Sequence, residues 1–303
     1  MQVYMQNDAR TEDLLRICTH TITKHISPYY TTGRIWGGRK KRCCTTCGRY
    51  SGIGREAKTI HALSYGGFTG MHATQWLVVF SAKLKKAFGR RLLFLGVQGS
   101  VRRGEATEHS DIDVVVVLDA LTGADMNRYR QIVQSMPHRE KACGFVCDVD
   151  TLRAWPGYDL FQLCYDTQAL HGNLEELLPP LSKRDVIDAM RVEAANLYHA
   201  CCQAYLYHAD APEMLQALYK SAFFLLRVKV YAQSGQFVLT KRELPDHLQG
   251  EEQEIAQQAL NLRNLKQQKC VLLSHVEKLV RLCQCVLQTC ASQSEESKKA
   301  LRV

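Results

Sequence analysis

Two aspartates, Asp111 and Asp113, open the apolar segment DIDVVVVL. Alternate side chains of a strand point to the same face, so these carboxylates share a face, with Cα atoms about 6.5–7 Å apart. Left alone they repel each other, and their desolvation beside the valines costs free energy unless a cation compensates the charge. Oxygen ligands of this type suit Mg²⁺. The pair therefore predicts a site for one or two divalent ions.

A Gly-Ser pair, Gly99 and Ser100, follows the preceding apolar segment RLLFLGV, with Gln98 between the segment and the pair. Glycine lets the backbone approach a phosphate closely, and serine offers a hydroxyl and an amide. A short helix starting there would add further amide groups, and Arg102 and Arg103 would add positive charge. The Gly-Ser pair and the acid pair thus fit one ligand, a nucleoside triphosphate carried with Mg²⁺.

The order strand, Gly-Ser, ten residues, Asp-Ile-Asp and apolar strand resembles the nucleotidyltransferases of the DNA polymerase β superfamily, with Gly99, Ser100, Asp111 and Asp113 at the matching positions. The wider layout is similar to that of the aminoglycoside nucleotidyltransferases, in which a minimal nucleotidyltransferase domain precedes a HEPN-like helical bundle. The resemblance extends over about residues 71–295. It implies an α+β fold with a small mixed-sheet domain and an antiparallel bundle.

The resemblance also implies a reaction. A nucleoside monophosphate, AMP from ATP, would pass to a hydroxyl of a small-molecule acceptor such as an aminoglycoside, with release of pyrophosphate. Asp111 and Asp113 would hold two Mg²⁺ ions that clamp the attacking and leaving oxygens. Gly99, Ser100 and Arg103 would bind the nucleotide.

Many members of the family add a third carboxylate from a later strand. Asp148 and Asp150 are the candidates here, and we favour Asp148 as the catalytic one because it lies nearer the strand. If neither aspartate is catalytic, the base that activates the acceptor must come from the bundle, or catalysis is impaired.

Two alternatives to this function remain. One is an enzyme that modifies a protein, as AMPylating antitoxins do, and the other is a catalytically impaired nucleotide-binding protein.

The segment 71–180 alternates between helical and strand patterns. Trp76, Phe80, Leu84 and Phe88 recur every four residues, which predicts a helix that ends at Gly89. Strands are expected over 91–97, 111–118 and 142–150, with a helix between the last two. The unbroken valines of the second strand predict burial on both of its faces.

The segment 181–295 is expected to hold four amphipathic helices, followed by a frayed tail over 296–303. The second of these helices carries Lys220 and Arg227 on an otherwise apolar sequence. We favour long side chains that keep their charges at the bundle surface. The alternative is that a basic residue faces the triphosphate across the cleft between the domains.

The composition of residues 1–70 predicts a basic, poorly ordered N-terminal extension. They carry eleven Lys/Arg against four Asp/Glu, whereas the rest of the chain carries 28 against 26. The near-neutral remainder argues against a general nucleic-acid-binding surface there. The thirteen cysteines are scattered through the chain and are expected to be reduced thiols. No apolar stretch is long enough to cross a bilayer, so we expect a cytoplasmic protein without membrane contact. A homodimer is compatible with the sequence.

Overall fold

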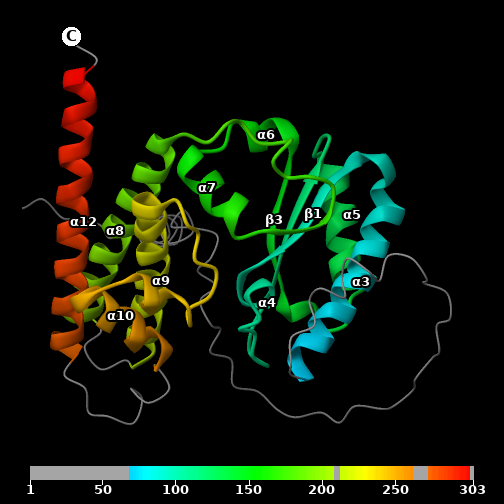
Figure 1. Cartoon of the computed structure of the whole chain (residues 1–303). Helices are drawn as coiled ribbons and strands as arrows, with labels where there is room; N and C mark the ends of the chain where they lie inside the picture. The colour runs from blue at the N-terminus through cyan, green and yellow to red at the C-terminus, as the bar shows by residue number, and fades with distance from the viewer. Residues whose placement is uncertain (1–67, 208–211, 262–271, 301–303) are drawn as a thin grey trace, which may run out of the picture.

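The computed structural model describes residues 68–207, 212–261 and 272–300. Two parts lie side by side in it (Figure 1): a sheet covered by helices, and a group of long helices built from the second half of the chain. The α+β fold predicted from the sequence is confirmed. The expected extension over 1–70 lies outside the described residues except for its last three, which begin the first described helix.

The sheet has four strands in the order β3-β2-β1-β4. Strand β1 pairs antiparallel with β2 and with β4, and β2 pairs parallel with β3, so the sheet is mixed as expected. The strands are β1 (Leu92–Gln98), β2 (Ile112–Leu118), β3 (Ala142–Asp148) and β4 (Gln168–His171).

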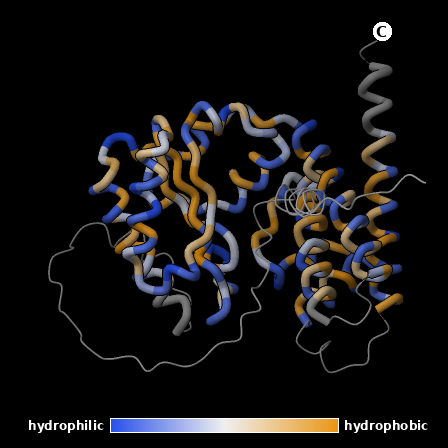
Figure 2. Tube along the Cα trace, turned by 180° about the vertical axis from the view of Figure 1, so that it is seen from behind, coloured by the Kyte–Doolittle hydropathy of each residue, from blue (hydrophilic) through white to orange (hydrophobic). Residues whose placement is uncertain are grey.

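Strand β2 is buried on both faces, as its valines predicted. Val114 and Val116 pack with side chains of α3 (Phe68–Phe88) and α5 (Gly123–Gln134). Val115 and Val117 pack with side chains of α6 (Val149–Arg153) and α7 (Gly157–Tyr165). Figure 2 shows the strands as hydrophobic segments between more mixed helices. A strand with helices on both faces is held rigidly.

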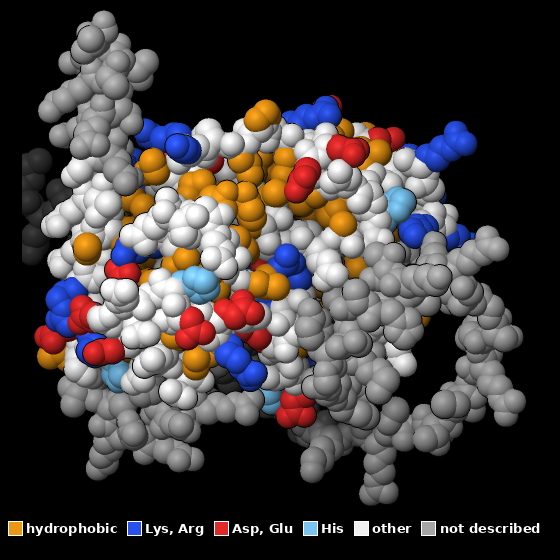
Figure 3. Space-filling model, viewed as in Figure 1, with side chains coloured by type: hydrophobic (Ala, Val, Ile, Leu, Met, Phe, Trp, Pro, Cys, Tyr) orange, Lys and Arg blue, Asp and Glu red, His pale blue; other side chains and the backbone are white. Residues whose placement is uncertain are grey.

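Helix α7 joins the two parts of the molecule. Its Leu160 and Leu163 belong to the apolar cluster on the sheet, whereas Phe161 belongs to the core of the helical part. Figure 3 shows hydrophobic side chains gathered in the middle of the molecule, over this junction. The short helix considered at the Gly-Ser pair is present as α4 (Gly99–Arg103), whereas the sequence did not predict α6, α7 or β4.

The four predicted helices of the second part are present. They are α8 (Lys183–Tyr207), α9 (Pro212–Ser234), α10 (Gly250–Leu260) and α12 (Leu272–Ala300). Short 3-10 helices occur at Gly89–Arg91, Arg139–Lys141 and Leu244–His247. Helix α12 continues to Ala300, into the segment 296–303 for which the sequence predicts a frayed tail.

The eight cysteines within the described ranges are free thiols. Among these same residues, none of the helices has the length and apolar character required to cross a bilayer.

Gly144 offers a test of the β2–β3 pairing. Its φ of 139° is unfavourable for other residues, and an added Cβ would overlap the backbone of Val114. We expect Gly144→Ala to lower the free energy of unfolding by at least about 2 kcal/mol in urea denaturation. Gly123→Ala is the control, since nothing lies near its Cβ position. Equal stability of the two variants would contradict the register.

Candidate active site

The acid pair lies where β2 begins. Asp113 is the second residue of β2 and Asp111 directly precedes the strand, and both are half-buried. Asp113 shares its face with Val115 and Val117, the face toward α7. Burial, and then the negative charge of Asp111, raise the pKa of Asp113 above its usual range. The two carboxylates are therefore close enough to repel each other.

Gly99 lies directly against Asp113. The sheet register pairs Gln98 with Asp113, so the residue that follows β1 stands beside the acid. Gly99 has a φ of 68°, and a Cβ at this position would overlap Asp113 Oδ2. Any other residue would strain the backbone and displace the carboxylate. The structure thus brings Gly99 and Ser100, the first residues of α4, to the acid pair.

Lys220 of α9 faces the acids from the helical part. Burial lowers the pKa of Lys220, while the charges of Asp113 and Asp111 act in the opposite direction. The preferred interpretation from the sequence, that Lys220 and Arg227 keep their charges at the bundle surface, is wrong. Lys220 is turned to the acid pair, and the side chain of Arg227 is fully buried. Sequence alone could not orient α9 against the sheet.

A second lysine reaches the site from the segment after α9. The backbone N–H of Lys241 donates to Glu105 Oε1 at 2.6 Å, just beyond α4. Burial, with the charge of Glu105 opposing it, lowers the pKa of the Lys241 ammonium. Neither Glu105 nor Lys241 belongs to a recognisable sequence motif, so neither was predicted as a site residue.

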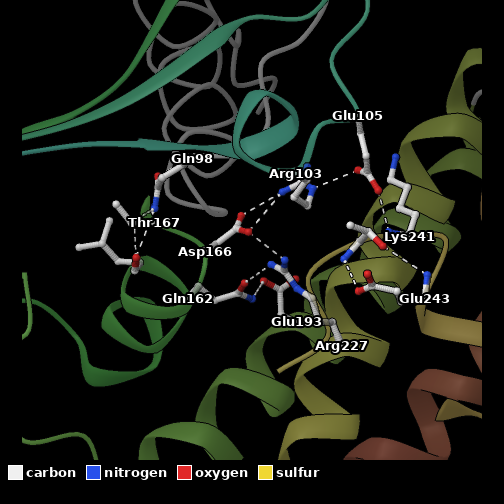
Figure 4. Close-up of polar contacts among 12 residues, drawn as sticks. Gln98, Arg103, Glu105, Gln162, Asp166, Thr167, Glu193, Arg227, Lys241 and Glu243 are labelled. Atoms are coloured by element: carbon white, nitrogen blue, oxygen red, sulfur yellow. Dashed lines mark hydrogen bonds and ion pairs between the residues drawn. The ribbon is translucent and has the colours of Figure 1, made fainter. Parts of the chain in front are cut away.

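Arg103, predicted from the sequence to bind the nucleotide, forms ion pairs inside the protein. Its side chain is only 4% exposed, with Nε at 3.1 Å from Glu105 Oε2 and Nη1 at 3.0 Å from Asp166 Oδ2. Burial by itself lowers the pKa of Arg103, but the charges of Asp166 and Glu105 outweigh it and raise the pKa. The guanidinium is thus committed to two carboxylates within the protein (Figure 4).

Asp148, predicted as a third catalytic carboxylate, lies far from the acid pair. In the parallel β2–β3 pair Asp113 lies opposite Cys143, whereas Asp148 lies opposite Leu118. Five residues of strand separate Asp148 from the level of Asp113, which is roughly 17 Å. Asp148 instead caps α6, its Oδ1 accepting a hydrogen bond from Thr151 N at 2.7 Å, and this bond lowers its pKa.

Cys143 takes the place beside Asp113 that a third acid would need. Burial and the neighbouring carboxylates raise the pKa of its thiol to about 11, so it stays uncharged at neutral pH. Asp150 is exposed on α6, at the same far end of β3 as Asp148. Within the described ranges no group of three or more His, Cys, Asp and Glu side chains is arranged to hold a metal. Two carboxylates alone fit a metal that also takes ligands from a bound triphosphate.

Residues 81–152, which include the Gly-Ser and the acid pair, match the family model of a nucleotidyltransferase domain. The chain contains a nucleotidyltransferase domain. The enzyme class predicted from the motif is confirmed by this match. A crystal structure of spectinomycin adenyltransferase from Enterococcus faecialis with ATP and spectinomycin is similar at 16% identity and a TM-score of 0.47, over 71% of this chain and 98% of that one. No curated protein sequence matches the chain.

A chain of polar contacts leads from the nucleotidyltransferase domain into the helical part and ends at Glu193 of α8. Arg227 Nη2 donates to Gln162 Oε1 at 3.3 Å, and Gln162 Nε2 donates to Glu193 Oε1 at 3.0 Å (Figure 4). Burial raises the pKa of Glu193 to about 7, although the charge of Arg227 lowers it in part.

Glu193 should therefore make stability depend on pH. The folded protein keeps the Glu193 proton to about pH 7, whereas the unfolded chain loses it near its ordinary pKa of 4.5. The contribution of the Glu193 proton to the free energy of unfolding is fully present below pH 4.5 and is lost as the pH rises through about 7. We expect Glu193→Gln to flatten the fall in unfolding free energy between pH 5 and pH 8, measured by urea denaturation.

Glu254→Gln is the matched control, because Glu254 is exposed on α10 and pairs with Lys278 at the surface. It should leave that pH dependence as in the wild type. An unchanged slope in Glu193→Gln would show that the carboxyl is ionised in the folded protein.

Proposed function

We propose that the chain is a Mg²⁺-dependent nucleotidyltransferase that moves AMP from ATP to a hydroxyl of a small-molecule acceptor such as an aminoglycoside and releases pyrophosphate. One observation supports it above all. The acid pair of the nucleotidyltransferase domain is faced by Lys220 from the helical part, with Gly99 in contact range of Asp113. Carboxylates for a metal and a cation for phosphates thus meet at one place.

Asp111 and Asp113 are the proposed metal ligands. Their oxygens are the donors that Mg²⁺ takes in proteins, usually one or two carboxylates together with substrate phosphates. When bound, the metal would neutralise negative charge on the triphosphate. Repulsion between the two acids, which raises the pKa of Asp113, is the cost that a cation would remove.

Lys220 is the proposed phosphate-binding residue of the helical part. Its partly desolvated ammonium lies opposite the acids, where it can stabilise negative charge on the triphosphate. Gly99 and Ser100 would hold the triphosphate from the other side through backbone amides and the Ser100 hydroxyl. The acceptor would then enter between the two parts of the molecule, since each contributes one wall of the site.

The acid pair gives the first test. Asp111→Asn and Asp113→Asn should each abolish pyrophosphate release from ATP in a screen of aminoglycoside acceptors, because the amide cannot replace a carboxylate metal ligand. Asp148→Asn is the matched control, and it should keep full activity and nearly full stability, because asparagine caps a helix about as well as aspartate. Full activity of both acid-pair variants would end the proposal.

Lys220 gives the second test. Lys220→Met should lower kcat/KM for ATP by about 10²-fold, the range seen when one charge-stabilising donor is removed. Lys229→Met is the control on the same helix, because Lys229 pairs with Glu252 of α10. Equal effects of the two substitutions would show that Lys220 has no direct part in binding ATP.

The lack of a third carboxylate beside the acid pair, among the residues that the structure describes, favours one other candidate, a nucleotide-binding protein with impaired catalysis. Cys143 cannot act as a base at neutral pH, since its pKa is raised to about 11. Three measurements together would support this candidate over the enzyme. Calorimetry would show binding of Mg·ATP, no acceptor would cause release of pyrophosphate, and α-labelled ATP would transfer no label to protein.

A further inference from the structure

Asp166 is a fully buried carboxylate between the two parts of the molecule. It follows α7, has no exposed surface, and lies between two arginines from different parts of the chain. Arg103 of α4 places Nη1 at 3.0 Å from Asp166 Oδ2, and Arg227 of α9 places Nη1 at 2.9 Å from Asp166 Oδ1 (Figure 4). One carboxylate therefore binds the helix that begins with Gly-Ser to the helix that carries Lys220.

The start of α4 is fixed at the same place. Gln98 directly precedes α4 and is buried, and its Nε2 donates to Thr167 Oγ1 at 2.6 Å. Thr167 is the neighbour of Asp166 and in turn donates to the carbonyl oxygen of Leu163 in α7. Residues 166 and 167 thus hold α4 at both ends, with Gly99 and Ser100 between the two contacts.

The bundle side of Asp166 is equally constrained. The guanidinium carbon of Arg227 lies 5.0 Å from the ring centre of Phe224 and 4.6 Å from that of Phe237. That of Arg103 lies 5.8 Å from the ring of Phe224, so both cations share one aromatic surface on α9. Stacked, buried guanidinium groups have few other positions available.

We propose that Asp166 is a positioning residue for nucleotide binding. Together with Gln98, Arg103, Thr167 and Arg227 it forms what we term the α4–α9 clamp, which fixes the distance between the Gly-Ser segment and Lys220. Asp166 itself does not touch the nucleotide. Its loss leaves two buried cations that repel each other, so α4 and α9 should separate. This inference rests on the proposed function for its nucleotide-binding part only.

The test compares Asp166→Asn with Asp125→Asn in the full chain. Asp125 is a buried acid that forms a two-bond ion pair with Arg91, at 2.8 and 3.0 Å, entirely within the nucleotidyltransferase domain. Both variants should lose stability. Only Asp166→Asn should raise amide hydrogen exchange in both α4 and α9 without nucleotide, and raise the Kd of Mg·ATP and the KM for ATP at least tenfold.

A third variant separates position from stability. In Asp166→Asn/Arg227→Met the remaining Arg103 stays paired with Glu105, so the buried charges balance again. Stability should recover relative to Asp166→Asn, while the raised exchange and the weak Mg·ATP binding persist. If Asp166→Asn does not fold, this double variant carries the test by itself.

Unchanged exchange in α4 or α9, or a Kd of Mg·ATP within threefold of the wild-type value in the folded variants, overturns the proposal. If the proposed function is wrong, the wild-type protein itself does not bind Mg·ATP. The change in amide hydrogen exchange of α4 and α9 in Asp166→Asn then tests by itself whether Asp166 couples the two helices.

Discussion

The arrangement of this site depends on one buried carboxylate shared by two arginines. Asp166 has no exposed surface, and its partners Arg103 and Arg227 come from α4 and α9. A buried charge is costly unless its partners are well placed, and removal of one partner costs more than the pair contributes. These three charges therefore favour the packing of the two parts in which they are paired. That packing also places Lys220 opposite the acid pair.

The acid pair depends on a second constraint, the rigid burial of β2. Val114 to Val117 are fixed from both faces, so the strand cannot rotate to bring Asp113 into solvent. Gly99 then closes the space on the other side, where a side chain would displace the carboxylate. The repulsion between Asp111 and Asp113 is held in place by packing, and a metal-bound triphosphate is the ligand that would relieve it.

Long periodic segments were predictable from the sequence, and short connecting elements were not. The valines of β2, the four-residue repeat of α3 and the four helices of the second part each bury enough apolar surface to show in the pattern. Helices α4, α6 and α7 and strand β4 have nine residues or fewer, too few to show a period. Yet α7 packs against both parts, and Asp166, directly after it, bonds to both α4 and α9.

The sequence by itself determined that Gly99 and Ser100 lie beside Asp111 and Asp113, because these residues are close along the chain and their spacing is read directly from strand geometry. Tertiary structure alone decided the rest. Asp148 lies away from the acid pair because the parallel register of β2 and β3 places Cys143, and not Asp148, beside Asp113. Arg103 became an internal ion-pair partner and Lys220 entered the site because α9 packs on α4 through Asp166. Such choices depend on contacts between residues some 60 positions apart, and no local pattern encodes them.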